Sequence, residues 1–237
     1  MSRLPLKKLF KKRNAKELMV YLIPLIILCL VWLLIILAKN VMSGDTIDFD
    51  KAILSFFRNP EDRTQPVGPE WVISAVRDIT ALGSSTIIAL IVIAVSGFLI
   101  LKKEYKSLFY ILFATIGGAA VANILKIFIG RQRPEFVSPL TMEYSMSFPS
   151  GHSVISAVVY LSLALLLMRI EPVFKTRIYI LSIAVVTTLL VGISRVYLGV
   201  HFPTDVLAGW ILGLTWALFC WFLASTIERR NRKNLSE

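Results

Sequence analysis

Long apolar runs recur along the chain, separated by short polar segments. Six of them contain no Asp, Glu, Lys or Arg: 18–38, 79–101, 107–125, 153–168, 178–194 and 206–227. A helix needs about 20 apolar residues to cross the hydrocarbon core of a bilayer, and a backbone in lipid must satisfy its own hydrogen bonds. The pattern therefore predicts an all-α integral membrane bundle of six transmembrane helices, formed as a single domain by residues 1–237.

Composition supports a membrane environment. Hydrophobic residues make up 56% of the chain, charged residues make up 17%, and the mean hydropathy is +0.72. Soluble domains have about 45–50% apolar and about 25% charged residues, so a soluble or disordered protein is excluded. The net charge of +11 favours an anionic partner, but long apolar runs separate the basic residues, which argues against nucleic acid. Cys29 and Cys220 both lie in apolar runs, which predicts neither a disulfide framework nor a zinc site.

Loop charges predict the orientation of the bundle. Basic residues gather in four places, namely before residue 18, at 102–106, at 169–177 and after residue 227. The positive-inside rule assigns such segments to the cytoplasm, so we expect a multi-pass protein of the cell membrane with both termini cytoplasmic. The basic N-terminus, residues 1–17, is expected to contact anionic lipids, and residues 228–237 form a cytoplasmic tail.

The long loop 39–78 is predicted to be external. It is rich in acidic residues, namely Asp45, Asp48, Asp50, Glu61, Asp62, Glu70 and Asp78. Its IDFDKAILSFF stretch predicts a short helix that lies in the membrane interface. Prolines and a glycine predict irregular chain after that helix, at Pro60, Pro66, Gly68 and Pro69.

Two further segments on the predicted external side, 126–152 and 195–205, are unusual for their charge. The positive-inside rule predicts few cations there. They nevertheless hold Lys126, Arg131, Arg133, Arg195, Asp205 and both histidines of the chain, His152 and His201. These residues fall in three clusters, KIFIGRQRP, PSGH and SRVYLGVHFPTD, each at the end of an apolar run. The clusters are therefore expected to meet at one membrane depth and to form an active site at the external membrane interface.

Cations grouped at one depth of an apolar chain predict an anionic ligand. A phosphate monoester carries a charge of about −1.5 to −2 at pH 7. Lys126, Arg133 and Arg195 are suited to bind it, because Arg offers paired donors that match phosphate geometry. Arg131 is expected only to extend its side chain toward lipid headgroups. In the PSGH cluster, Ser150 is predicted to cap a helix, and Gly151 lets an anion approach the helix N-terminus.

The last cluster predicts an activated histidine. Proline is favoured at the first helical position, so a helix is expected to begin near Pro203, with Asp205 one turn beyond His201. The Asp205 carboxylate is then placed to accept a hydrogen bond from Nδ1–H of His201 and to leave Nε2 available. A histidine of this kind acts as a nucleophile or base. A solvated loop histidine is the alternative, and a metal site is disfavoured because the cluster is rich in cations. No cofactor is expected.

Together the three clusters resemble the signature of the type 2 phosphatidic acid phosphatase superfamily. That signature is Lys, six residues, Arg-Pro; then Pro-Ser-Gly-His; then Ser-Arg, five residues, His, three residues, Asp, and residues 126–205 match it throughout. The resemblance implies a metal-independent hydrolase that forms a phosphohistidine. It implies that His201 attacks phosphorus, that Asp205 orients His201, and that His152 protonates the leaving group and then activates water. The phosphoryl oxygens would be held by Lys126, Arg133, Ser150, Gly151 and Arg195.

A site at the lipid–water boundary predicts a membrane lipid as substrate. We expect an isoprenoid diphosphate first, with undecaprenyl diphosphate hydrolysed to undecaprenyl phosphate, because an external site suits a lipid that is recycled on the outer face. A glycerolipid phosphate, either phosphatidylglycerophosphate or phosphatidic acid, is the alternative. A transporter that binds lipid phosphate without cleaving it would also use the cations, but it would not need His152, His201 and Asp205. The sequence leaves the oligomeric state open.

Overall fold

The structure, a computed structural model, describes residues 15–141 and 145–234 and is helical almost throughout that part of the chain. Its helices are α1 (Ala15–Ser43), α2 (Ile47–Phe56), α3 (Glu70–Ala81), α4 (Ser85–Leu101), α5 (Tyr105–Ile129), α6 (Gly151–Ile170), α7 (Phe174–Tyr197) and α8 (Pro203–Asn234). The described ranges contain no β-strand, only an isolated bridge between Arg58 and Pro66. The all-α prediction is confirmed. Of the basic N-terminus and the C-terminal tail, residues 1–14 and 235–237 lie outside the described residues.

Five of these helices are long and apolar enough to cross a membrane on their own. They are α1 from Val20, α5, α6, α7, and α8 as far as Arg230. The sixth candidate is the pair α3 and α4, which meet at an angle of 44° across a break of three residues. The six apolar runs of the sequence therefore correspond, in order, to six candidate spans.

The second span differs from its prediction as one continuous run over 79–101. Its chain turns between Ala81 and Ser85, where the Ser84 side chain accepts a hydrogen bond from the backbone N–H of Ile87 and caps α4. Gly83 lies in the turn, and a Cβ there would be 2.4 Å from Val191 of α7 and 3.4 Å from Cβ of His152. Close packing against α6 and α7 thus produces the bend. Helix α3, which begins just after Pro69, was not predicted.

Helix α6 is the centre of the bundle and packs against α5, α7 and α8. It is also the most buried of the five independent candidate spans. Two glycines let α8 lie close to it, since a Cβ at Gly209 would be 2.7 Å from Ser153 and a Cβ at Gly213 would be 2.5 Å from Ala157. Small residues at helix interfaces are typical of membrane bundles, because close backbone approach increases van der Waals contact.

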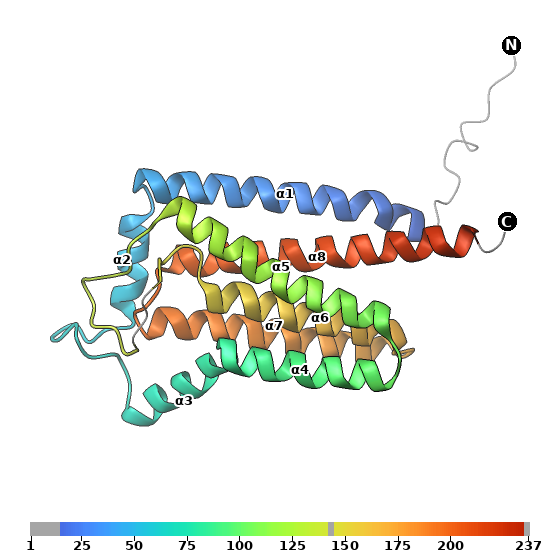
Figure 1. Ribbon diagram of the computed structural model, residues 1–237. Coiled ribbons are helices and arrows are strands. Elements are labelled where there is room, and N and C mark those ends of the chain that lie inside the picture. Colours follow the sequence, from blue (N-terminus) through green and yellow to red (C-terminus); the bar gives the residue numbers. More distant parts are fainter. Residues whose placement is uncertain (1–14, 142–144, 235–237) are drawn as a thin grey trace, which may run out of the picture.

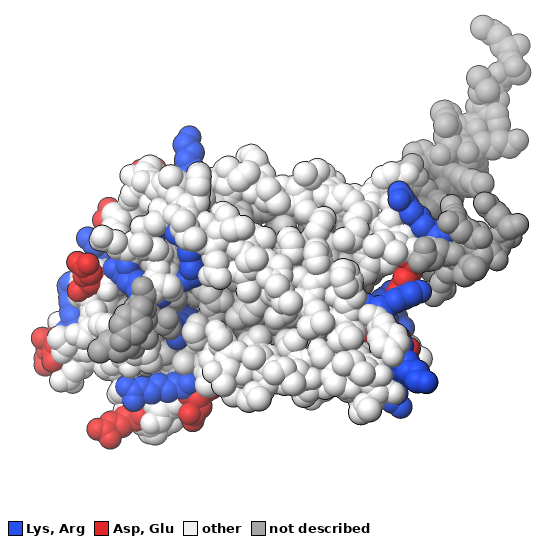
Figure 2. Space-filling view, in the orientation of Figure 1, with Lys and Arg blue, Asp and Glu red and all other residues white. Residues whose placement is uncertain are grey.

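The two ends of the bundle differ in structure (Figure 1). We call one the site end: it carries α2, α3 and the connections 57–69, 130–150 and 198–202. The opposite end carries short turns at 102–104 and 171–173 and the last residues of α8. Figure 2 shows Lys, Arg, Asp and Glu gathered at both ends, with a broad uncharged band between them. Bilayer-facing side chains are expected to form such a band.

Helix α2 confirms that the IDFDKAILSFF stretch is helical. Ile47, Asp50 and Leu54 share one face of it at the spacing i, i+3, i+7. Leu54 packs with residues of α7 and α8, and Asp50 is fully buried on the same face. The helix therefore lies against the start of α8 at the site end (Figure 1).

Candidate active site

The three sequence clusters meet at the site end, as predicted. Lys126 lies in the last turn of α5, His152 in the first turn of α6, and Arg195 in the last turn of α7. His201 and Asp205 flank the start of α8. A cavity of about 240 Å³ opens among these elements. Its lining includes Lys126, Arg133, Gly151, His152 and His201, together with Ser85, Asn123 and Ser145.

The N-terminus of α6 faces the cavity. Ser150 caps the helix and accepts a hydrogen bond from the backbone N–H of Ser153 at 3.5 Å, which confirms the predicted cap. Gly151 leaves the approach open, since a Cβ there would come within 3.7 Å of Lys126 Cε. The first N–H groups of a helix, together with its dipole, bind anions. The N-terminus of α6 and the Lys126 ammonium group therefore line the same part of the cavity.

Main-chain carbonyls and hydroxyls orient the predicted phosphate-binding cations. Lys126 Nζ donates to the Met146 carbonyl at 2.7 Å. Arg133 donates from Nε to the Ser145 carbonyl at 2.8 Å and from one terminal nitrogen to the Val200 carbonyl at 2.6 Å. Arg195 is buried and donates to the Thr80 hydroxyl of α3 at 3.0 Å. Helix α3 therefore supports the site, although the sequence patterns did not predict it.

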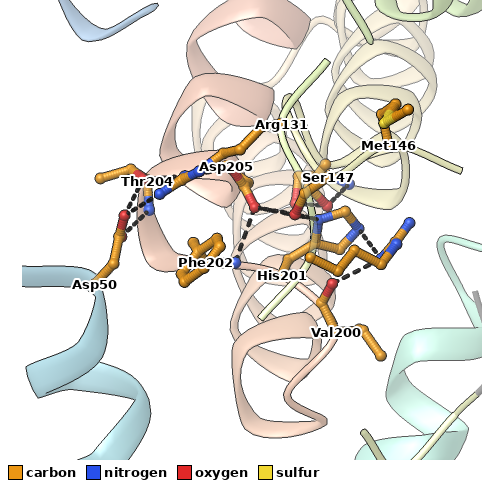
Figure 3. Close-up of polar contacts among 12 residues, drawn as sticks. Asp50, Arg131, Met146, Ser147, Val200, His201, Phe202, Thr204 and Asp205 are labelled. Carbon is orange, nitrogen blue, oxygen red and sulfur yellow. Dashed lines mark hydrogen bonds and ion pairs between the residues drawn. The ribbon is translucent and has the colours of Figure 1, made fainter. Parts of the chain in front are cut away.

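The hydrogen bonds of His201 identify its tautomer. Its Nε2 lies 3.2 Å from a terminal nitrogen of Arg133. Arginine only donates, so Nε2 accepts and the ring proton is on Nδ1. Nδ1 lies 3.3 Å from the Ser147 hydroxyl, and that hydroxyl donates to Oδ2 of Asp205. Figure 3 shows Ser147 between the imidazole and the carboxylate.

The direct hydrogen bond predicted between Nδ1–H of His201 and Asp205 is therefore corrected to a relay. Nδ1 and Oδ2 are 3.6 Å apart, which is too far for a normal hydrogen bond. Ser147 completes the connection: it accepts from Nδ1–H and donates to the carboxylate. Sequence reasoning missed Ser147, although it stands three residues before Ser150 and thus next to the PSGH cluster.

His201 is neutral at physiological pH. Its side chain is almost completely buried, and burial lowers its pKa from 6.5 to about 4. The nearby carboxylate of Asp205 acts in the opposite direction, and the Arg133 and Arg195 charges add to the lowering. A neutral imidazole with the proton on Nδ1 has its lone pair on Nε2, the nitrogen that faces Arg133. His201 is one of the residues that line the cavity.

The Asp205 carboxylate is held by three donors. Oδ1 accepts from Arg131 at 2.6 Å. Oδ2 accepts from the backbone N–H of Phe202 at 2.9 Å and from the Ser147 hydroxyl. The carboxylate is fully buried, so these bonds replace the water that it would otherwise bind. Its orientation is consequently determined by groups from two connections, 130–150 and 198–202.

Arg131 does not extend toward lipid headgroups, and that expectation is wrong. Its guanidinium donates to Asp205 at 2.6 Å and to Asp50 of α2 at 2.7 Å, and its side chain is only 11% exposed. Its Cζ lies 4.0 Å from the centre of the Phe202 ring. Residues so far apart in the chain show no local pattern that predicts this pairing. The one available signal was an acidic residue, Asp50, on the apolar face of a predicted helix.

Among residues 15–141 and 145–234, no group of three or more His, Cys, Asp and Glu side chains is arranged to hold a metal ion. Asp205 accepts hydrogen bonds from its neighbours, and His201 meets Arg133 and Ser147. The residues at this site are thus suited to binding an anion.

Comparison with known proteins agrees with this description. A model of the PAP2 superfamily matches residues 107–229. Phosphatidylglycerophosphatase B of Bacillus subtilis (strain 168) is 45% identical over 149 residues, 61% of this chain and 71% of that protein. Undecaprenyl-diphosphatase of Sulfolobus acidocaldarius is 32% identical over 126 residues, 51% of this chain and 56% of that protein. The chain thus spans little more than half the length of this second relative.

A solved structure has the same fold. The crystal structure of a transmembrane PAP2 type phosphatidylglycerolphosphate phosphatase from Bacillus subtilis aligns with a TM-score of 0.72. The alignment covers 86% of this chain and 96% of that chain, at 32% sequence identity. The helical bundle and the placement of its spans are therefore shared with a membrane protein of known structure.

Proposed function

Because the chain belongs to the PAP2 superfamily and is a multi-pass membrane lipid phosphatase, we propose that it hydrolyses phosphatidylglycerophosphate. The observation that carries this choice is the 45% identity to a phosphatidylglycerophosphatase B over 149 residues. This order reverses the one expected from the loop charges, which put isoprenoid diphosphate first.

The cavity is consistent with a lipid headgroup. At about 240 Å³ it is smaller than the roughly 300–1,000 Å³ of pockets that enclose drug-sized ligands. It accommodates a phosphoryl group and the first atoms of a headgroup, so the acyl chains stay in the bilayer. Ser85 of α4 and Asn123 of α5 also line it, and we propose that they contact the glycerol hydroxyls.

We propose that the reaction proceeds in two steps through His201. Nε2 attacks phosphorus and forms an N–P bond, while the P–O bond to the headgroup breaks and its oxygen takes a proton from His152. Water then attacks phosphorus and gives its proton to His152, and the N–P bond breaks to release inorganic phosphate. The buried, neutral state of His201 supports the first step, because only the neutral imidazole is a nucleophile.

We propose that the cations stabilise the negative charge that develops on the phosphoryl oxygens. Lys126, Arg133 and Arg195, with Ser150 and Gly151 at the N-terminus of α6, are proposed to bind the phosphoryl oxygens. In the absence of substrate, Arg133 donates to Nε2 of His201. A bound phosphoryl oxygen is a stronger acceptor for a guanidinium, so substrate binding would release Nε2 for attack. The Ser147 relay would hold the Nδ1 proton toward Asp205 during that step.

The proposed orientation places both termini in the cytoplasm and the site end outside, on the basis of the loop charges. The basic N-terminus is proposed to bind anionic lipids. A thiol reagent that does not cross membranes tests the orientation in a background without Cys29 and Cys220. Labelling at position 138 but not at 103 in intact cells is expected, and the reverse would overturn it. An external site also requires phosphatidylglycerophosphate to reach the outer leaflet before hydrolysis.

An isoprenoid diphosphate is the second candidate substrate. It is favoured by the similarity to an undecaprenyl-diphosphatase and by the number of cations around the cavity, which suits a diphosphate. Phosphate release by the purified full chain would compare phosphatidylglycerophosphate, undecaprenyl diphosphate, phosphatidic acid and a water-soluble sugar phosphate. We expect the highest kcat/KM for phosphatidylglycerophosphate. A higher value for undecaprenyl diphosphate would establish the second candidate, and activity confined to the sugar phosphate would contradict both.

A further inference from the structure

A buried ionic network connects α2 to the carboxylate behind His201. Arg131 lies between two aspartates, with one terminal nitrogen 2.6 Å from Asp205 and the other 2.7 Å from Asp50 (Figure 3). Both aspartates are fully buried. Asp50 lies in α2 and Asp205 in α8, 155 positions later in the chain (205 − 50). A single guanidinium orients both carboxylates.

Asp50 also binds the start of α8 directly. Its Oδ1 accepts from the backbone N–H of Thr204 at 3.0 Å, and its Oδ2 accepts from the Thr204 hydroxyl at 2.7 Å. The same hydroxyl accepts from Arg131 at 2.8 Å, which closes a ring of three residues. Asp50 thus orients Arg131 and the first turn of α8, the turn that holds Asp205.

A network of this kind is an expensive way to stabilise a helix contact. Desolvating two carboxylates and a guanidinium costs free energy that apolar residues of the same size would not cost. Elsewhere α2 packs through Leu54 and its apolar neighbours, and Lys51 lies 5.9 Å from the centre of the Phe136 ring. Stability alone therefore does not explain why charged residues occupy this contact, whereas a requirement for one precise carboxylate orientation does.

We propose that Asp50 and Arg131 are positioning residues: they hold the Asp205 carboxylate so that Oδ2 faces Ser147 and His201, which keeps the His201 proton on Nδ1 and directs Nε2 into the cavity. This proposal rests on the phosphohistidine mechanism proposed above. It gives α2, which lies in the long loop outside the motif region 126–205, a role in positioning the catalytic residues. The two residues do not touch the substrate; they act through Asp205.

Two conservative substitutions test the proposal. Asp50→Asn keeps an oxygen that can accept from Thr204 but removes the charge that orients Arg131. Arg131→Lys keeps a positive charge but cannot reach both carboxylates as a planar fork does. Matched controls are Asp48→Asn, at an exposed position of α2, and Arg63→Lys, at an exposed position of the following loop.

The first readout is the rate of phosphohistidine formation by the full chain in detergent, with phosphatidylglycerophosphate as the probe. Asp50→Asn and Arg131→Lys are each expected to slow this step about 100-fold, the size of effect produced by a displacement of about 1 Å in a catalytic group. KM should change less than about twofold, because neither residue contacts the lipid. The two control variants are expected to match the unsubstituted protein.

The second readout requires no substrate. The chain has two histidines, so ¹⁵N-labelled histidine gives two sets of imidazole signals, and His152→Ala identifies those of His201. In the unsubstituted protein we expect a proton on Nδ1 and an unprotonated Nε2. In Asp50→Asn we expect a mixture of tautomers, whereas Asp48→Asn should keep the original signals.

Three results would decide the question. A slowed first step with an altered tautomer and unchanged KM supports the positioning role. An unchanged tautomer in Asp50→Asn overturns it, and so does a loss of activity explained by a lower Tm or a raised KM. If the unsubstituted protein forms no phosphohistidine with any lipid phosphate, the proposed mechanism fails, and the tautomer comparison still tests the positioning of His201.

Discussion

Arginine–carboxylate pairs occur at both ends of the bundle, and their surroundings differ. At the opposite end, Arg169 pairs with Glu228, and the two side chains are 32% and 30% exposed. At the site end, Arg131 pairs with Asp50 and Asp205, both fully buried. Water and salt screen the first pair, so it contributes little, whereas a buried charge without its partner is strongly destabilising.

This difference indicates what each end requires. The opposite end needs only charged residues at the depth of the lipid headgroups, and their exact geometry matters little. The site end needs specific orientations for one imidazole and one carboxylate, so its charges are buried and bound by several donors. Substitutions at the site end should therefore have large effects on the rate of the reaction. Substitutions at the opposite end should have small effects on both activity and stability.

The largest expected effect is at His201. His201→Ala should reduce turnover to background and form no phosphoenzyme, because the nucleophile is absent. His152→Ala should lose about 10²–10⁴-fold, the contribution of a general acid and base, and should accumulate an acid-labile, base-stable adduct. Rapid quench with ³²P-labelled substrate would measure both.

For His152→Ala, the loss in the first step should depend on the leaving group. A diphosphate leaves behind a phosphate, which needs protonation less than an alkoxide does, so its first step should be less impaired than that of a monoester. An adduct in His201→Ala would contradict this assignment of roles.

Arg195→Lys is expected to lower kcat on the order of 10²-fold, comparable with the loss of one donor to a developing oxyanion. Lysine keeps the charge but cannot donate to Thr80 and to a phosphoryl oxygen from one planar group. Steady-state kinetics with a Tm measurement would separate lost chemistry from lost folding. Near-normal turnover would place Arg195 outside the phosphate site.

The pH at which His201 becomes protonated tests whether its side chain is buried. With a pKa of about 4, roughly nine-tenths of His201 should remain neutral at pH 5, whereas a solvated histidine with a pKa of 6.5 would be roughly 3% neutral. Because the pKa is lowered, protonation occurs only as the pH falls toward 4. The ¹⁵N signals of His201 between pH 7.5 and pH 4 measure this directly. A midpoint near 6.5 would contradict the buried, neutral nucleophile.

Ser147→Ala should slow the first step about as much as Asp50→Asn, on the order of 100-fold, because Asp50 and Arg131 are proposed to act on His201 through this hydroxyl. The hydroxyl that connects Nδ1 of His201 to Asp205 would be lost, while both partners would keep other contacts. Single-turnover phosphate transfer is the suitable measurement. Ser156→Ala, at a buried serine of α6 whose hydroxyl donates to the Ser153 carbonyl, is the matched comparison. An equal loss in both variants would indicate a packing effect.

The smallest expected effect is at the opposite end. Arg169→Gln should leave kcat and KM unchanged and should shift stability by about 0–1 kcal/mol, the usual range for an exposed pair. Thermal unfolding in detergent and the phosphate-release assay would check both. A loss of activity in this variant would show that the two ends of the bundle are coupled. It would contradict the expectation that the exposed pair matters little for activity.

Much of the fold is a property of the sequence alone. Six apolar runs are sufficient to predict a six-span helical bundle, since lipid leaves a spanning backbone few other options. The helix at Ile47–Phe56 and the start of a helix at Pro203 were also predicted from local signals. The bend at Gly83 and helix α3 were not, because they depend on how closely the turn at Gly83 packs against α6 and α7 and on the packing of α3 against α7.

The site also has features that the sequence predicts and features that depend on the tertiary structure. Lys126, Arg133, His152, Arg195 and His201 were predicted to meet because each lies at the end of an apolar run, and run ends on one side of a bilayer share one depth. Local signals were sufficient for that. They did not decide which of these side chains would line the cavity and which would lie behind it.

Only the tertiary structure decided the contacts of Arg131, Asp50 and Ser147. The two arginines of the GRQRP segment, Arg131 and Arg133, stand two positions apart in similar local sequence, yet one binds buried carboxylates and the other lines the cavity. Depth in the membrane follows from hydropathy, which is a property of each segment. The direction of a hydrogen bond depends on which distant segments, here α2 and the start of α8, are packed against that side chain, and local sequence does not encode that.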